Sequence, residues 1–138
     1  MKSCFMIGHR EADEEIYPIL LEAVVRCIEE DAVEEFIVGH YGGFDRLAKR
    51  AVTEAKRRYP VRLTLLLPYI PAPKELTAGF DGALYPFERR VPPRTAIVRA
   101  NRMSVDACAC VIAYARHPGN ARDLADYARK HEKKIICI

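Results

Sequence analysis

The sequence predicts an α/β protein with a Rossmann-like three-layer fold, built on a mostly parallel sheet of about five or six strands. Short β-rich runs alternate with longer runs of helical spacing along the 138 residues, which is typical of parallel strands joined by crossover helices. Several β-rich runs, such as LTLLL and IICI, are apolar almost throughout, as expected for strands covered on both faces. We expect residues 1-138 to form one domain, because this length is enough to bury an ordinary core.

The first half of the chain contains three expected strands and two expected helices. The strands are CFMIG, EFIVG and RLTLLLP, at residues 4–8, 35–39 and 62–68. A helix from about residue 11 to 31 shows an apolar face through Ile16, Leu20 and Val24. A second helical stripe begins at Phe44 and is stopped by Pro60.

The second half adds two strands, two helices and one long connection. Strands are expected at CVIAYA and KIICI, with a helix starting near Pro93 and another around residues 121–131. Residues 68–94 hold six of the nine prolines and show little periodicity except at ALYPF, the candidate for a short edge strand. A connection of this length indicates either a lid or ligand loop over the carboxyl ends of the strands, or an irregular surface connection.

Composition and charge limit the function classes. Half of the residues are apolar and 30% are charged, with a formal net charge of +3, so the chain has globular composition. The small positive excess suits an anionic small molecule, and we expect no nucleic acid as a partner. No apolar run is long enough to span a membrane and the first residues lack a signal-peptide layout, so we expect no membrane partner.

No metal site and no cofactor are expected from the cysteines and histidines. The five cysteines each lie in an apolar segment, which favours small core residues in a reducing cytosol and hence a cytoplasmic protein. His9, His40 and His117 lie at or near strand ends, but no carboxylate or cysteine stands at metal-ligand spacing from them.

The stretch FIVGHYGGFDRLAKRA, residues 36–51, changes from a strand to a helix through three glycines. Such a turn places backbone N–H groups at a helix N-terminus, where they and the helix dipole favour phosphate or another anion. Gly39, Gly42 and Gly43 permit positive φ and close approach of a ligand. Asp45 either caps the helix or binds a ribose hydroxyl. The glycine spacing does not match the G-x-G-x-x-G dinucleotide fingerprint.

Other polar residues follow or precede strands so that they reach the same edge of the sheet. GHR follows the first strand, RANRMSVD lies on the helix before CVIAY, and RHPGNARD follows that strand with a further glycine turn. Ligands of open parallel sheets bind at this edge. The convergence of these groups predicts a ligand pocket there.

The motifs FMIGHR, VGHYGGFDRLA, VPPRTAIVRANRMSVD and VIAYARHPGNARDLADYARKHEKKIICI together resemble the SLOG superfamily. This Rossmann-like group links the cytokinin-activating phosphoribohydrolases, the Lonely Guy or lysine-decarboxylase-like proteins, with the DNA-processing DprA proteins. The chain is most similar to its small, uncharacterised, single-domain bacterial members with a TGHR-like start. The resemblance runs in order through nearly the whole chain, least securely in the middle loop.

The resemblance implies a pocket for a nucleotide or a nucleotide-derived ligand, such as a nucleoside monophosphate or an ADP-ribose-like molecule. By motif match, the ligand-binding residues would be Gly8, His9, Arg10, Gly39, Gly42, Asp45, Arg94, Asn101, Arg102, Asp106 and Gly119.

The catalytic motif of the phosphoribohydrolases is altered in this chain. These enzymes carry PGGxGTxxE, whose Glu assists cleavage of the N-glycosidic bond, whereas this chain has HPGNARDLADYA. Alignment on the last helix places Leu124 at the Glu, and alignment on Pro118 places Asp126 there. Without a well-placed carboxylate, an oxocarbenium-like transition state loses its main stabiliser.

Two main hypotheses follow, and it is uncertain from the sequence whether the protein is an enzyme. The first is a sensor or carrier that binds a nucleotide-type ligand. The alternative is an N-glycosidase that releases free base, with Asp126 or Asp106 as the candidate catalytic carboxylate. A third hypothesis is a fold retained for protein–protein contact, and the apolar helix faces would also suit a homo-oligomer.

Overall fold

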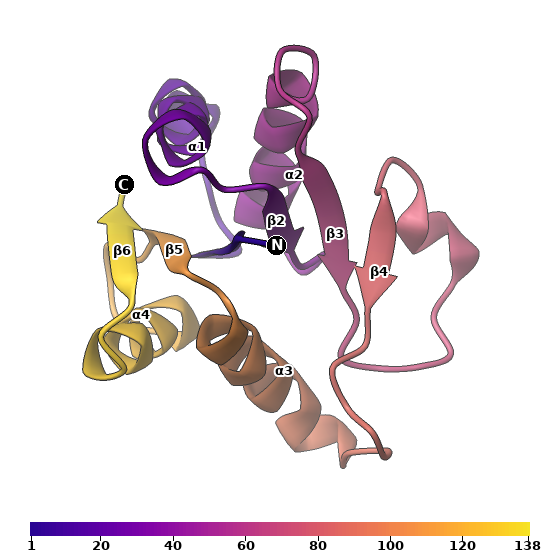
Figure 1. The fold of residues 1–138 in the computed structure, drawn as a ribbon. Coiled ribbons are helices and arrows are strands. Elements are labelled where there is room, and N and C mark those ends of the chain that lie inside the picture. Colours follow the sequence, from indigo (N-terminus) through magenta and orange to yellow (C-terminus); the bar gives the residue numbers. More distant parts are fainter.

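A computed structural model describes all 138 residues, and it confirms the predicted fold class. The sheet has six strands in the order β4-β3-β2-β1-β5-β6, and every neighbouring pair is parallel (Figure 1). The strands are β1 (Ser3–Gly8), β2 (Glu35–Val38), β3 (Arg62–Leu66), β4 (Gly82–Leu84), β5 (Cys110–Tyr114) and β6 (Lys134–Cys137).

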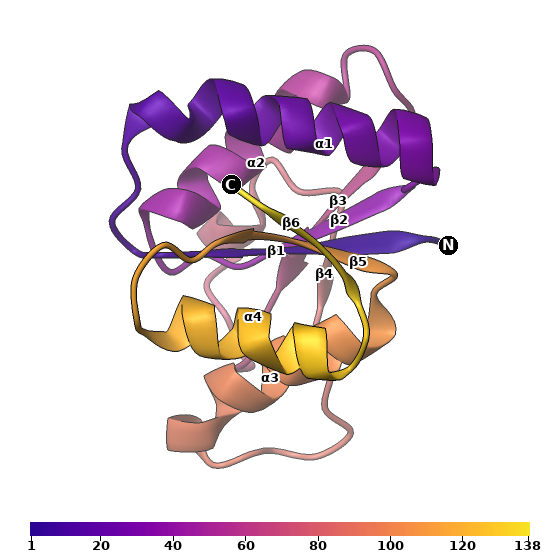
Figure 2. The same cartoon turned by 90° about the vertical axis from the view of Figure 1, so that its left-hand side faces the viewer.

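Four α-helices cover the sheet, two on each face (Figure 2). The helices α1 (Tyr17–Asp31) and α2 (Gly43–Ala55) pack on one face, and α3 (Pro93–Ala107) and α4 (Asn120–Lys130) pack on the other. Two short 3-10 turns, η1 (Glu14–Ile16) and η2 (Lys74–Thr77), lie in the connections. Each face has its own buried apolar cluster, so the sheet separates two core layers.

The strand order reverses at the centre of the sheet. The chain moves outward from β1 through β2 and β3 to β4, and then returns to place β5 on the other side of β1. Phe5 pairs with Val111 and Gly8 with Tyr114, so the carboxyl ends of β1 and β5 are level. The connections that leave these two strands diverge, which opens a crevice where ligands of this architecture bind.

The first helix begins later than the sequence pattern indicates. Residues 14–16 form a 3-10 turn, and the α-helix starts at Tyr17 with Pro18 in its first turn. An N–H in the first turn of a helix has no acceptor within the helix, so proline loses no hydrogen bond there. Its fixed φ is already helical. The Asp13 side chain accepts the Glu15 N–H at 3.4 Å and ends the preceding loop.

The long connection after β3 is partly regular. It contains η2 and the three-residue edge strand β4, which overlaps the predicted ALYPF segment at Ala83 and Leu84. The Asp81 carboxylate accepts the Leu63 N–H at 2.8 Å and pairs with Lys56, which fixes the start of β4 against β3. The Tyr69 hydroxyl donates to the Pro93 carbonyl oxygen at 2.9 Å, so the two ends of the connection meet.

The glycines between β2 and α2 serve close packing. Gly42 has an extended φ of 173°, and the glycines with positive φ are Gly79 and Gly119. A Cβ on Gly42 would lie 2.6 Å from the Arg10 Cα, and one on Gly43 would lie 2.7 Å from the Arg10 carbonyl oxygen. The backbone that approaches this turn is therefore the chain's own loop after β1, and the expected use of positive φ here is wrong.

Replacing Gly43 by alanine should destabilise the protein, although alanine is normally the better residue in a helix. The added methyl group would press on backbone that cannot rotate away, so we expect the free energy of unfolding to fall by about 1–3 kcal/mol in urea denaturation. Thr53→Ala, an exposed change in the same helix, should stay within about 0.5 kcal/mol of the unmodified protein. Equal stability of Gly43→Ala and the unmodified protein would show that the contact can relax.

Candidate functional site

A cavity of about 390 Å³ lies at the carboxyl end of β1, between the starts of α3 and α4. Apolar side chains from the sheet and the helices form part of its wall, among them Phe5, Ile7, Ile97, Val98 and Leu124. Its polar lining residues are His9, Arg10, Tyr41, Asp45, Arg94, Asn101 and Asn120. An apolar cavity with a few convergent polar groups is the usual form of a small-molecule site.

The structure brings many of the predicted ligand-binding residues to this cavity. Those that line it are Gly8, His9, Arg10, Gly39, Asp45, Arg94 and Asn101. They come from the end of β1, from the loops after β1 and β2, and from the helices α2 and α3. Pro68 and Arg94, at the two ends of the long proline-rich connection, both line the cavity, so that connection leaves and returns at the site.

Four other predicted residues lie outside the cavity lining: Gly42, Arg102, Asp106 and Gly119. The guanidinium carbon of Arg102 lies 5.0 Å from the centre of the Tyr127 ring. The Tyr127 hydroxyl donates to both carboxylate oxygens of Asp106, at 2.8 and 3.1 Å. Helix α3 thus presents Asn101 to the cavity and Arg102 and Asp106 to α4. Gly42 and Gly119 are the N-caps of α2 and α4.

His9 joins the ends of β1 and β5. The backbone N–H of His9 donates to the Tyr114 carbonyl at 3.2 Å. Its ring Nε2 accepts the backbone N–H of His117 at 3.4 Å. The rings of His9 and His117 are stacked with their centres 3.6 Å apart. Burial, with smaller effects from the nearby His117 and Arg122, lowers the pKa of His9, which favours the neutral ring that this acceptor role requires. The sequence contained no signal for the His117 contact, since the partners are 108 residues apart.

The two helix N-termini at this edge of the sheet differ in their free donors. At α2, the Gly43 N–H donates to the Arg10 carbonyl at 2.6 Å and the Phe44 N–H to the His9 carbonyl at 3.4 Å. The glycine turn that predicted a phosphate site therefore has these donors occupied by the protein. At α4, the N–H groups of Asn120 and Ala121 make no backbone hydrogen bond within the chain, and both residues line the cavity.

Asp45 is the one carboxylate among the lining residues. It lies in the first turn of α2, and its Oδ2 accepts the Tyr41 N–H at 2.8 Å, so it stabilises the turn without being the N-cap. Burial raises its pKa to about 6, and the Tyr41 hydrogen bond opposes that rise. The predicted catalytic candidates lie elsewhere: Asp126 is exposed and pairs with Arg129 at 2.8 Å, and Asp106 faces Tyr127.

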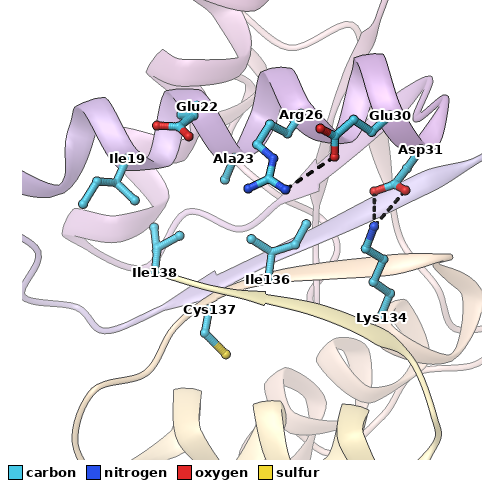
Figure 3. A pocket seen from close by; sticks show the side chains of 10 residues that line it. All are labelled: Ile19, Glu22, Ala23, Arg26, Glu30, Asp31, Lys134, Ile136, Cys137 and Ile138. Atoms are coloured by element: carbon cyan, nitrogen blue, oxygen red, sulfur yellow. Dashed lines mark hydrogen bonds and ion pairs between the residues drawn. The ribbon is translucent and has the colours of Figure 1, made fainter.

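A second hollow, of about 160 Å³, lies between α1 and the edge strand β6 (Figure 3). Its charged groups largely pair with one another: Lys134 with Asp31 at 2.8 Å and Arg26 with Glu30 at 3.5 Å. Charged groups that are already in ion pairs are less available to bind a ligand than the N–H groups at the start of α4, which have no backbone partner. We therefore take the larger cavity as the candidate site.

Similar proteins were sought by sequence and by structure. No family model and no curated protein matches this sequence. Among solved structures, DNA processing protein A (DprA) from Helicobacter pylori is similar with a TM-score of 0.70 and 18% identity, over 99% of this chain and 64% of that one. DprA from Streptococcus pneumoniae matches with a TM-score of 0.69 and 16% identity, over 99% of this chain and 50% of that one.

The chain shares its fold with DprA. The Moco carrier protein from Chlamydomonas reinhardtii is also similar, with a TM-score of 0.61 and 16% identity, over 99% of this chain and 75% of that one. DprA is one of the groups that the SLOG resemblance names, and at these identities the similarity shows a shared fold. This chain spans about half to two thirds of the DprA chains.

The similarity to DprA contradicts the expectation that nucleic acid is not a partner. The H. pylori structure is described by its single-stranded DNA binding mode. The expectation rested on a net charge of +3, and net charge does not report how basic groups are distributed over a surface.

Among the helices, none combines the length and the apolar character that a membrane span requires.

The raised pKa of Asp45 predicts a pH-dependent cost to stability. The folded pKa of about 6 exceeds that of an unfolded aspartate, about 3.9, so the folded state binds the proton more tightly. Stability should therefore fall as pH rises through this window, by up to about 3 kcal/mol. Asp45→Asn keeps an acceptor for Tyr41 and should be more stable than the unmodified protein at pH 7.5 in urea denaturation.

The same measurement at pH 4 is the control for Asp45→Asn. Near this pH the folded state keeps the carboxyl neutral, so most of the stability difference should be gone. A difference of the same size at both pH values would mean that packing, and not ionisation of Asp45, accounts for the effect.

Proposed function

We propose that this protein binds a nucleotide-type small molecule, a nucleoside monophosphate or an ADP-ribose-like ligand, in the cavity at the end of β1. The observation that carries the proposal is the unpaired N-terminus of α4, whose Asn120 and Ala121 line the same cavity as Arg10 and Arg94. Backbone donors at a helix N-terminus together with guanidinium groups are a general means of binding phosphate.

The remaining lining groups suit the rest of a nucleotide. Asn101 and Asp45 offer donors and acceptors for ribose hydroxyls or for a base edge, while Ile97 and Val98 offer apolar surface for the flat face of a base. The volume of about 390 Å³ lies in the range of small-ligand pockets, about 300–1,000 Å³. His9 acts indirectly in this proposal, because it holds the turn before α4 through His117.

Within this proposal, binding as a sensor or carrier is favoured over base release. An N-glycosidase needs a carboxylate near the ribose C1′. Neither Asp126 nor Asp106 lines the cavity, and Asp45, which does, already accepts the Tyr41 N–H within the α2 turn. The similarity to a protein named as a carrier of Moco agrees with a binding role. We further propose that the chain is a small SLOG-type protein of the TGHR group and, from its free thiols, that it resides in the cytoplasm.

The proposal is tested by calorimetric titration with adenosine monophosphate and with ADP-ribose. Arg94→Ala should weaken binding about tenfold or more, because a charge-assisted hydrogen bond contributes about 1.5–3 kcal/mol. Arg102→Ala is the matched control: it removes the same charge from the same helix, but its guanidinium lies over Tyr127, so the affinity should be unchanged.

Chromatography of the titrated samples separates binding from catalysis. Intact ligand after long incubation supports the sensor or carrier role, and free base would establish the N-glycosidase and direct attention to Asp45. Failure of both ligands to bind, or equal losses in Arg94→Ala and Arg102→Ala, would refute the proposed site.

Single-stranded DNA is a second candidate ligand, favoured by the similarity to a DprA whose structure concerns that ligand. Its phosphates could use the same N-terminus of α4. Fluorescence anisotropy with oligothymidylates of increasing length distinguishes the two candidates. A DNA-binding surface gives affinity that rises with length and falls steeply with salt, whereas a mononucleotide pocket gives one affinity that free adenosine monophosphate competes away.

A further inference from the structure

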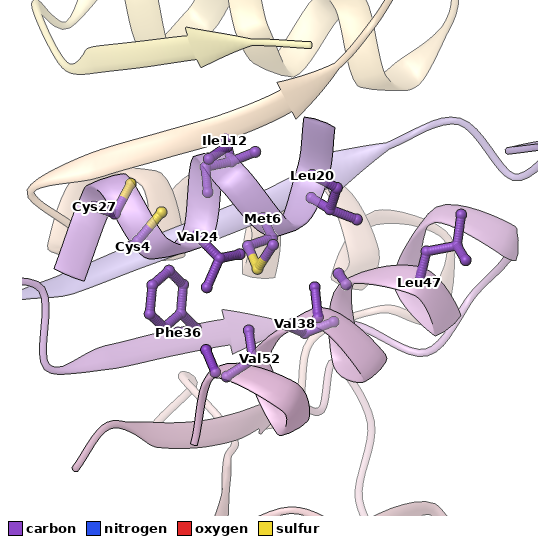
Figure 4. Close-up of a cluster of buried hydrophobic side chains, with 14 of the residues drawn as sticks. Cys4, Met6, Leu20, Val24, Cys27, Phe36, Val38, Leu47, Val52 and Ile112 are labelled. Atoms are coloured by element: carbon purple, nitrogen blue, oxygen red, sulfur yellow. The ribbon is translucent and has the colours of Figure 1, made fainter. Parts of the chain in front are cut away.

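Three cysteines that are distant in sequence meet in the core near the amino ends of the strands, away from the ligand cavity. Cys4 lies on β1, Cys27 on α1 and Cys110 on β5, and their sulfur atoms all lie within 4.8 Å of one another. Cys4 and Cys110 are direct partners in the β1–β5 register. Figure 4 shows the sulfur atoms of Cys4 and Cys27 beside each other between α1 and the sheet.

A buried cysteine is ordinarily a small apolar residue, and Cys108 illustrates that role. Cys108 is 1% exposed and packs in the other core layer, on the α3 and α4 side of the sheet. The other three cysteines differ from Cys108 because three separate elements bring their sulfur atoms together. Each of the three residues is 2% exposed or less. Thiolates around a common metal at about 2.3 Å would be about 4.0 Å apart, so the observed spacing needs little adjustment.

The donor set indicates the class of metal. The cluster consists of sulfur alone, and the neighbouring core side chains, such as Val24, Phe36 and Ile112, are apolar. Zinc in structural sites takes four ligands, and here no fourth His, Cys, Asp or Glu joins the group. Soft thiolates select copper(I), zinc and iron–sulfur clusters, and iron–sulfur clusters, like structural zinc, take four protein ligands. We propose that Cys4, Cys27 and Cys110 form a three-coordinate thiolate site for copper(I).

The surroundings indicate a direction from which copper(I) would enter. Lys134 is the register partner of Cys110 on β6, and its Nζ pairs with Asp31 at the end of α1 at 2.8 Å. Both residues line the hollow between α1 and β6 (Figure 3), so this hollow borders the cluster on the solvent side. Each cysteine that binds copper(I) loses its thiol proton to solvent, and no electron is transferred because copper stays monovalent.

The test is an anaerobic titration of the fully reduced protein with copper(I) against a chromophoric copper(I) chelator. We expect one copper(I) per chain and three sulfur neighbours in the X-ray absorption spectrum. Cys27→Ala should lower the copper(I) affinity at least ~10-fold, since even outer-shell changes at metal sites cost about 10–100-fold. Cys108→Ala and Cys137→Ala, which remove a buried and an exposed thiol outside the cluster, should bind copper(I) as the unmodified protein does.

Circular dichroism reports whether Cys27→Ala folds. If it does not fold, the copper(I) stoichiometry and the X-ray absorption spectrum of the unmodified protein still test the proposal. Three sulfur neighbours that persist in Cys137→Ala support the site. The proposal is overturned if the chelator retains all the copper, if the spectrum shows nitrogen or oxygen neighbours, or if binding disappears in Cys137→Ala.

Discussion

The contact between the end of β1 and the turn that follows β2 organises one whole edge of this protein. The carbonyl groups of His9 and Arg10 accept the first N–H groups of α2, and glycines at 42 and 43 let the two backbones approach to that distance. On the other side, His9 holds the end of β5 through its N–H and the turn before α4 through its Nε2. A single segment thus determines where two helices begin relative to the central strand.

This arrangement makes the two helix N-termini unequal. The chain's own carbonyls accept the first N–H groups of α2, whereas the first N–H groups of α4 make no backbone hydrogen bond. The switch in strand order between β1 and β5 places both helices around one crevice. In the proposed binding mode the phosphate lies on the β5 side of the crevice. Asp45, inside the α2 turn, lines the cavity from the β2 side.

The core, unlike the site, consists of apolar packing on both faces of the sheet. The α1 and α2 layer and the α3 and α4 layer are separate apolar clusters on opposite faces of the sheet. Apolar packing specifies volume and pattern more than residue identity, so a cluster of three thiols in one layer is not required by the fold. Its position near the amino ends of the strands keeps it apart from the groups that line the cavity.

Periodicity by itself determined the order and type of nearly all elements, because strand and helix patterns depend on neighbours a few residues away. It also indicated that Gly8, His9, Arg10, Asp45 and Asn101 reach one edge of the sheet, and in the structure these residues line one cavity. It misjudged the start of α1, where Pro18 and a 3-10 turn delay the helix. The edge strand near ALYPF was predicted from local pattern in the same way.

Only the tertiary structure decided which groups are free. Asn101 and Arg102 are adjacent in sequence, yet one lines the cavity and the other lies over Tyr127, because about 100° separates neighbours around a helix. The use of the α2 donors by His9 and Arg10, the His9–His117 stack and the meeting of three cysteines all join residues far apart in the chain. No local pattern encodes such contacts, since they arise only when the sheet brings the ends of its strands together.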